Sequence, residues 1–484
     1  MAKVDTPHEQ YTEMSSRWKR CRDAVEGRDA VAGAGAEYLP MLSGQSQPEY
    51  DAYKARASFY GAVYRTVQGH SGSVFRRPPE ISVPDAAEEW LEDITLTGVP
   101  LVGLMLEALR ELLEVGRYAL YVEMPRKTED ETATPRPYLV LVPAESVVSW
   151  RTENRDGKQI LNRVVVRESV AEQNPEDEFI LDTVEQYRVF ALAEDGYSQT
   201  VWRKPADSNE YEIHEGPIYP DKRAAVFDEI PFWFGNVTDV TPNVQRPPLM
   251  EIVDLSLSMW RNSADLENGY HYVGIPTPWV AGFPVKTKLN IGSNRAWISD
   301  KTDAKVGMLE FTGQGLNGLS EHIDRKKADC SVFGSRLLEE QKKAAETAET
   351  VRLRHAGESA SLVSMADTLD ATFGAAMEFA LNWAGITGES EIRTNRDLLA
   401  IKATPQELQA LTKALQSGAM SWETYYHNLE QLELSRPGVD AEEEIAAIES
   451  DADRAVVLTV SQGRPADEAE EERAAALADE AEAA

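Results

Sequence analysis

The sequence predicts an α+β fold in which helical regions lie on both sides of a long β region. Residues 1–80 carry apolar side chains at helical spacing. Residues 136–235 are runs of β-branched and aromatic residues punctuated by turn residues. From Pro247 to about Trp383, helical patterns enclose a short segment rich in proline, glycine and aromatic residues. Because periodicity distinguishes helices from strands, these three observations set the class as α+β.

Composition indicates a large, acidic, globular protein. The chain has 484 residues, 42% of them hydrophobic, which is enough for a sizeable core and more than one domain. It carries 82 Asp and Glu against 49 Lys and Arg, a net charge of −33. This charge opposes non-specific adhesion to nucleic acid, which depends on Lys and Arg replacing counterions. A solvated surface or a halophilic source would give the same acidity.

Cysteines and hydropathy indicate a reducing compartment. Cys21 and Cys330 lie far apart and neither belongs to a C-x-x-C pair, so we expect neither a disulfide framework nor a zinc site. The first residues lack the apolar core of a secretory signal. No apolar run reaches the roughly 18 residues of a membrane-spanning helix. We therefore expect assembly in the cytoplasm and no membrane partner.

The N-terminal region is predicted to be mainly helical. Residues 48–69 repeat apolar side chains at nearly helical spacing, which predicts one helix ending at a glycine-rich turn. The repeating side chains are Tyr53, Ala57, Tyr60, Tyr64 and Val67. Pro78 and Pro79 then end regular structure.

Residues 84–124 are predicted to form a helix followed by a strand. Asp85 is a candidate N-cap, and Gly116 stands where a helix C′ residue belongs. Between them one helix face carries Leu101, Met105, Leu109 and Leu112. A strand follows Gly116, and the runs over 136–235 predict an antiparallel or mixed sheet.

The central region has an unusual order of elements. A helix over 247–270 precedes a short β-containing segment, 271–312, in which prolines and glycines exclude a continuous helix. A second helix, 313–340, leads into a polar stretch, 341–359, and then a long helix from residue 360. Two helices flanking a small β segment suit a ring-forming subunit better than an enzyme.

The C-terminal region is predicted to hold a short strand near residue 391 and two helices. Thr404 and Pro405 open the first of these helices as N-cap and first residue. Residues 440–484 carry 15 acids against three arginines, a net charge of −12. A segment so acidic and alanine-rich is helical or disordered.

Catalytic signatures are absent from the sequence. The seven histidines are scattered, with no H-E-x-x-H, no G-x-S-x-G and no P-loop motif. We therefore expect no catalytic residues, no metal, no cofactor and no enzymatic activity. A hydrolase using carboxylates in an unrecognised arrangement is a remote alternative.

Several blocks of the sequence, spanning roughly residues 37–400, resemble the portal proteins of tailed bacteriophages. They include YLPMLSGQSQPEYDAYKARASFYGAVYRTVQG, EIPFWFGN with the helix that follows, and MLEFTGQGLNGLSEHIDRKKADCSVFGSRLLEEQ. The resemblance lies in the order and length of the blocks, because no single motif is a signature.

The resemblance implies a portal-like fold. The expected parts are N-terminal helices with an α/β wing, a two-helix stem, a small β-containing clip, a tunnel loop with a long helix, a helical crown and an acidic tail. Their ranges are 1–246 for the N-terminal helices and wing, 247–270 and 313–340 for the stem, 271–312 for the clip, 341–359 for the tunnel loop, 360–402 for the long helix and wing return, 403–439 for the crown and 440–484 for the tail.

The resemblance also implies a function. Portal proteins form a homo-oligomeric ring, typically of twelve subunits, at one vertex of the capsid in the virion. Double-stranded DNA is packaged and ejected through the ring. The expected partners are other copies of the chain, DNA bound without sequence preference, the terminase large subunit, a head–tail adaptor, and the major capsid or scaffold protein. A structural head or minor capsid protein without a DNA channel is the alternative.

The resemblance assigns candidate residues to three surfaces. The first stem helix would pack against a neighbouring subunit through Leu249, Ile252, Val253, Leu257 and Trp260. The clip would meet terminase and adaptor through Trp279, Phe283 and Trp297. The tunnel loop would touch DNA weakly through Lys342, Lys343, Glu346, Glu349, Arg352 and Arg354, since the acids limit how tightly phosphates are held. Ordinary surface charge explains the same basic residues equally well.

Overall fold

A computed structural model describes residues 3–125, 135–174, 177–205, 208–222, 225–275, 277–283, 297–310, 312–333, 348–396, 398, 405–432, 434–435, 439 and 441–448. The chain divides into two units, Met1–Leu398 and Leu399–Ala484. The larger unit mixes helices with antiparallel sheets, so the predicted α+β class is confirmed.

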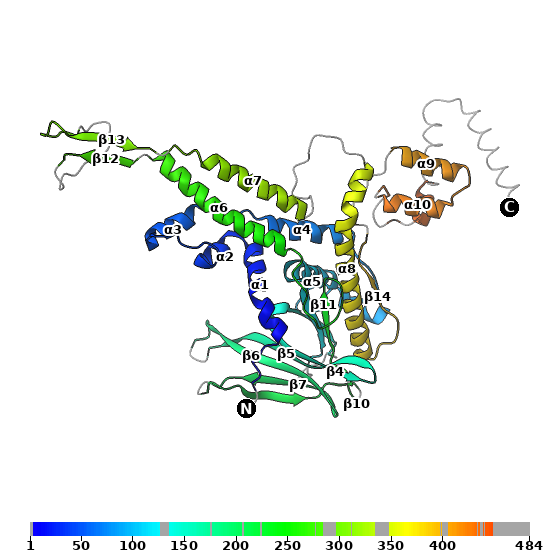
Figure 1. Cartoon of the computed structure of the whole chain (residues 1–484). Coiled ribbons are helices and arrows are strands. Elements are labelled where there is room, and N and C mark those ends of the chain that lie inside the picture. The colour runs from blue at the N-terminus through cyan, green and yellow to red at the C-terminus, as the bar shows by residue number, and fades with distance from the viewer. Residues whose placement is uncertain are drawn as a thin grey trace, which may run out of the picture. The chain divides into compact units, whose positions relative to one another are not determined.

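The larger unit opens with four helices (Figure 1). They are α1 (Glu9–Glu26), α2 (Arg28–Gly33), α3 (Gln47–Arg56) and α4 (Ala62–Val74), with the 3-10 turn η1 (Gly35–Glu37) between α2 and α3. One face of α1 is buried at Met14, Trp18, Cys21 and Ala24, which are three or four residues apart. A capping box between Ser46 and Glu49 begins α3.

The single helix predicted over 48–69 is wrong, because the chain breaks between α3 and α4. The backbone of Ser58 bonds to the helix α6 (Met250–Gly274), where its N–H donates to Ser263 Oγ at 3.0 Å and its carbonyl accepts from the same hydroxyl at 2.7 Å. Phe59 also packs edge-on against Trp260. These contacts to a distant helix outweigh the local helical pattern.

The next segment follows the predicted order of helix and strand. A 3-10 turn, η2 (Asp85–Leu91), replaces the helix start predicted at Asp85, and α5 (Leu101–Val115) begins only after Pro100. The α5 stripe is buried, and Gly116 ends the helix in the left-handed conformation at φ 79°, as predicted. Strand β2 (Arg117–Glu123) follows directly.

Two antiparallel sheets form the centre of the larger unit. The first has the order β11-β2-β3, with β3 at Tyr138–Pro143 and β11 at Phe232–Asn236. The second is a five-stranded meander in sequence order. Its strands are β4 (Val147–Arg155), β5 (Lys158–Gln173), β6 (Leu181–Ala193), β7 (Gly196–Arg203) and β8 (Glu212–Ile218), preceded by the 3-10 turn η3 (Ala144–Ser146). The β region predicted over 136–235 is therefore present and antiparallel.

Small strand pairs complete the sheet content. β1 (Glu80–Ser82) pairs with β14 (Glu391–Arg393), and β9 (Asp221–Lys222) pairs with β10 (Ala225–Val226). β12 (Thr277–Ala281) pairs with β13 (Lys305–Leu309). All of these pairs are antiparallel.

Three helices account for the predicted central region. They are α6 (Met250–Gly274), α7 (Leu316–Phe333) and α8 (Ala348–Ala384). From residue 360 onwards α8 buries a helical stripe that includes Leu369, Phe373 and Met377, and it packs against β11, β2 and α5. The smaller unit holds α9 (Pro405–Gln416) and α10 (Trp422–Gln431), with further helical turns at 441–448. Thr404 and most of the acidic tail lie outside the described residues.

Candidate assembly surfaces

The pair α6 and α7 is joined through the β12–β13 hairpin. Figure 1 shows the two strands continuing from the ends of the two helices, which pack on one another. The two helices approach closely at the joint, where a Cβ on Gly269 would require the end of the Leu316 side chain to move. Gly313, just before α7, adopts φ 64°, which favours glycine. The chain order helix, short antiparallel pair, helix matches the sequence expectation for 247–340.

The first half of α6 is covered by other helices of the same chain. Its five predicted interface side chains are all buried inside the chain's own core, with Trp260 completely inaccessible. They are Leu249, Ile252, Val253, Leu257 and Trp260. The cause is packing of α6 against α1, α3 and α4 from the N-terminal region. These five side chains have almost no exposed surface in the single chain, and their predicted contact with a neighbouring subunit stays a prediction.

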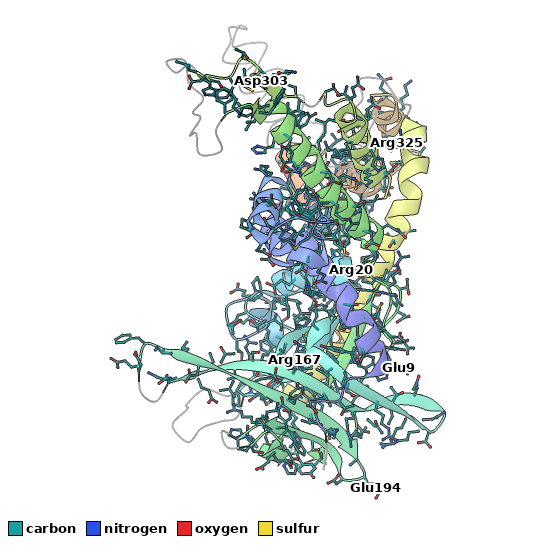
Figure 2. The ribbon with its side chains drawn as sticks, turned by 60° about the vertical axis from the view of Figure 1, so that its left-hand side comes forward. Glu9, Arg20, Arg167, Glu194, Asp303 and Arg325 are labelled. Carbon is teal, nitrogen blue, oxygen red and sulfur yellow. The ribbon has the colours of Figure 1, made fainter. Side chains whose placement is uncertain are left out.

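The basic side chains of α7 also have local partners. Lys326 Nζ donates to Ser258 Oγ at 2.7 Å and to Asn262 Oδ1, both on α6. Burial lowers the pKa of Lys326, and the nearby Arg261 charge adds to this effect. Lys327 pairs with Asp324 at 3.0 Å, whereas Arg325 is exposed on α7 (Figure 2). Lys326 thus joins two helices and is not free to meet a phosphate.

The end of α6 and the hairpin expose apolar side chains, which together we call the hairpin patch. It consists of Tyr270, Tyr272, Ile275, Trp279, Val306, Met308 and Leu309. The strand register puts Val306 and Met308 on one face of the hairpin and Leu309, with Trp279, on the other. Large apolar side chains exposed on both faces of one hairpin indicate an interaction site.

Within the hairpin, Trp279 occupies a defined position. It pairs across the strands with Gly307, where a Cβ would lie 2.7 Å from the indole Nε1. The glycine therefore lets the ring lie against the opposite strand while one edge stays exposed. Phe283 and Trp297 are half-buried at the far end of the hairpin. The residues between them, 284–296, lie outside the described part of the chain. The predicted contact of these three aromatic residues with terminase and adaptor stays a prediction.

The helical start of α8 changes the predicted tunnel loop. The segment 341–359 was expected to be a loop, but α8 begins at Ala348, so its second part is helical. Glu349, Arg352 and Arg354 therefore lie on helical backbone. Lys342, Lys343 and Glu346 lie outside the described residues. The helix extends over 348–359 because alanine, glutamate and arginine are good helix formers and the segment contains only one glycine, Gly357.

Sequence reasoning missed Tyr270, Tyr272 and Ile275. It followed the single apolar stripe at the start of α6 and assigned that stripe to a partner. A usable signal was the second group of aromatic and aliphatic residues after Asn268, beyond Ala264, where the buried stripe ends. Apolar side chains that continue past the covered part of a helix indicate a further contact.

Ionisable groups cluster at a structural position. Arg22 on α1 donates to Glu111 and Glu114 of α5, both at 2.5 Å, and to Glu145 at 2.8 Å. Burial raises the pKa of Glu111 to about 7, although the Arg22 charge opposes that rise. Since one guanidinium engages all three carboxylates, the cluster joins α1 to α5 and η3 and leaves no free acid–base pair. Among the described residues, no three His, Cys, Asp or Glu side chains are placed to hold a metal ion.

One protein-family model matches the central region of the chain. A domain of unknown function, DUF4055, matches residues 248–384, which run from the start of α6 to the end of α8. This is less than half of the chain. A comparison with curated proteins finds no match. No helix among the described residues is both long and apolar enough to cross a membrane.

Solved structures give a weak but consistent likeness. The chain is similar to a component of the virion of a native gene transfer agent particle, at 12% identity and TM-score 0.38, covering 84% of this chain and 98% of that one. Two neck structures of the particle, solved with C6 and C12 symmetry, match at 12% and 11% identity with TM-scores of 0.36. They cover 85% and 78% of this chain and 99% and 92% of theirs. TM-scores below 0.5 do not by themselves establish a shared fold.

Proposed function

We propose that this chain is a portal subunit, which forms a ring at one vertex of a phage-like particle and performs no catalysis of its own. The observation that carries the proposal is the unit α6–β12–β13–α7, which leads on to the long helix α8 and exposes the hairpin patch. A domain of unknown function spans the same elements.

Assembly follows from the stability of a two-stranded hairpin. An isolated pair of strands is marginally stable in water and has two open edges. The β12–β13 pair also exposes apolar side chains on both faces. Neighbouring copies would cover these faces and edges. A head-to-tail contact repeated from copy to copy produces a ring when the rotation between copies brings the last one back to the first.

In the proposed ring, DNA slides through a channel whose walls are mainly acidic. The net charge of −33 disfavours tight binding of phosphates, which depends on Lys and Arg. Residues 341–359 supply the weak, sequence-independent contacts, through the four basic residues of that segment. The hairpin end provides the docking surface for terminase during packaging and for the adaptor afterwards.

Imaging tests the ring. Purified full-length protein, with and without the scaffold protein of its particle, should give ring-shaped particles in negative stain, and those in the virion should sit at one vertex. Protein that stays monomeric under both conditions and is distributed over the virion would refute the portal assignment. That outcome would favour a head protein without a channel.

The DNA contact is tested separately. One variant replaces the four basic residues of segment 341–359 by Ala. A control removes the same amount of positive charge from the exposed β4–β5 hairpin. The variant changes Lys342, Lys343, Arg352 and Arg354, and the control changes Arg151, Arg155, Lys158 and Arg163. We expect the variant alone to form normal rings but to package or retain less DNA. Equal packaging by both would leave the segment without a DNA role.

A further inference from the structure

The β5–β6 hairpin extends beyond the rest of its sheet. β4 pairs with β5 only as far as Val166, and β7 pairs with β6 only from Gln186. Residues 167–173 and 181–185 therefore form a two-stranded arm, seen in Figure 2 as a ribbon that projects past the other strands. We call it the hairpin arm.

The end of the hairpin arm presents an apolar tip of three consecutive residues. Phe179, Ile180 and Leu181 are 88%, 48% and 66% exposed. The end of the projecting hairpin therefore exposes one aromatic ring and two aliphatic side chains to water, and burying them against a partner would be favourable. The tip is therefore a candidate for insertion into a partner.

Hydrogen bonds hold the apolar tip in one conformation. Asp177 Oδ1 accepts from the Phe179 N–H at 2.9 Å, and the Asp177 carbonyl accepts from the Ile180 N–H at 3.2 Å. Asn174 donates from its backbone N–H to the Ile180 carbonyl at 3.0 Å and from its amide to Asp182 Oδ2 at 2.9 Å. A tip ordered before binding loses little entropy when it docks.

A groove elsewhere on the same chain has the volume and the apolar lining to take the tip. It lies where the end of α1 meets the start of α4, has a volume of about 460 Å³ and is lined by the apolar side chains of Val25, Phe59 and Tyr64. Arg28 and Arg65 stand at its walls, with Glu26 as the single acid. The space suits a phenylalanine ring with an adjacent aliphatic side chain.

Charge distinguishes this groove from most of the molecule. The apolar tip is flanked by Asp177, Glu178 and Asp182, so most of an acidic surface would repel it. Arg28 pairs with Asp29 at 3.7 Å, so the positive charge that the groove offers is mainly that of Arg65, which is exposed beside the half-exposed Tyr64. Apolar and electrostatic matching therefore point to the same place.

We infer that the apolar tip of one copy docks into the groove between α1 and α4 of a second copy of this chain. Because tip and groove are different surfaces, the contact is head-to-tail and repeats from subunit to subunit. The inference rests on the proposed function only in that the chain assembles with itself.

Cross-linking between different copies tests the contact. Both native cysteines are buried, so any disulfide that forms between chains comes from the introduced thiols. A Glu178→Cys chain mixed with a Glu26→Cys chain should form a disulfide-linked dimer on oxidation, since each carries one partner thiol and neither change removes an apolar anchor. Glu194→Cys mixed with Glu26→Cys is the control, because Glu194 is an exposed acid at the opposite end of β6 (Figure 2).

Charge reversal gives a second measurement. Glu178→Arg and Arg65→Glu should each weaken self-association by about 5-fold or more, and the pair combined should recover most of the loss. Phe179→Ala should weaken it by about 30-fold, as expected of an aromatic anchor. Glu194→Arg and Ile213→Ala alter exposed residues of the same sheet and should have no effect.

The outcomes separate this contact from the portal proposal. Cross-linking no faster than in the Glu194 control, or no recovery in the double charge reversal, would overturn the tip–groove contact. Rings that form without the cross-link overturn the contact and leave the portal proposal standing. Cross-linked chains that never close into rings support the contact and count against the portal.

Discussion

Two aromatic residues of α6 distinguish a core face from an assembly face. Trp260 is completely buried and packs edge-on against Phe59 in the core of the larger unit. Tyr272, three turns later on the same helix, is 51% exposed in the hairpin patch. Replacing each with Ala therefore tests whether the first half of α6 holds the fold together or contacts a neighbour.

The structure sets the expected size of each effect. Trp260→Ala should lower the free energy of unfolding by about 3–5 kcal/mol, since it removes a fully buried aromatic side chain and leaves a cavity. Tyr272→Ala should change that free energy by no more than about 0.5 kcal/mol, as is usual for surface substitutions. The same variant should weaken self-association by about 5-fold or more, because aromatic residues anchor interfaces.

Urea unfolding followed by far-ultraviolet circular dichroism measures the stability of both variants, and sedimentation velocity measures assembly. Circular dichroism is used because Trp260→Ala removes one tryptophan and would change a fluorescence signal independently of unfolding. If Trp260→Ala unfolds at the parental urea concentration but no longer assembles, then the side chain faces a neighbour in solution and the burial argument fails. If Tyr272→Ala assembles normally, the hairpin patch does not extend to the end of α6.

Three further predictions follow from local geometry. Gly116→Ala should destabilise the fold by about 1 kcal/mol or more in thermal unfolding, because φ is 79° there and a Cβ would lie 3.2 Å from the Arg246 carbonyl. Burial lowers the pKa of His70 from 6.5 to about 4, so the contribution of His70 to stability should be full above pH 6.5 and fall by about 3 kcal/mol as the pH drops to 4. The raised pKa of Glu111 acts in the opposite direction, so the fall is read from the difference between the parent and a His70 variant. His70→Phe should abolish that fall in urea titrations. Lys326→Met should raise the exchange rate of amide hydrogens in α7, since it removes the hydrogen bonds to α6.

Local signals in the sequence predicted elements well where neighbouring residues decide the structure. The α5 stripe, its end at Gly116 and the following strand are specified within a few residues of each other. The break between α3 and α4 was not predictable in this way, because it depends on Ser263 and Trp260, distant residues that become neighbours only in the fold.

Candidate surfaces were harder to predict than elements. An apolar stripe indicates that a helix face is covered, but it does not indicate whether the cover comes from the same chain or another. The start of α6 is covered by N-terminal helices of its own chain. The β pattern predicted over 136–235 likewise includes Phe179, whereas this residue lies before the start of β6 and is exposed. Exposure depends on where a hairpin turns and how far its neighbours extend.

The pairing of β1 with β14 has a consequence for biosynthesis. Ile81 lies opposite Ile392, so β1, which is made early, cannot form its sheet until β14, near the end of the larger unit, has been made. During translation, the ribosome must release nearly the whole of that unit before the pair can form. Helix α8 and its buried stripe also emerge late, after both central sheets. The nascent chain therefore exposes the apolar surfaces of β2 and β11 until α8 has been made, and chaperones would act on it during that interval.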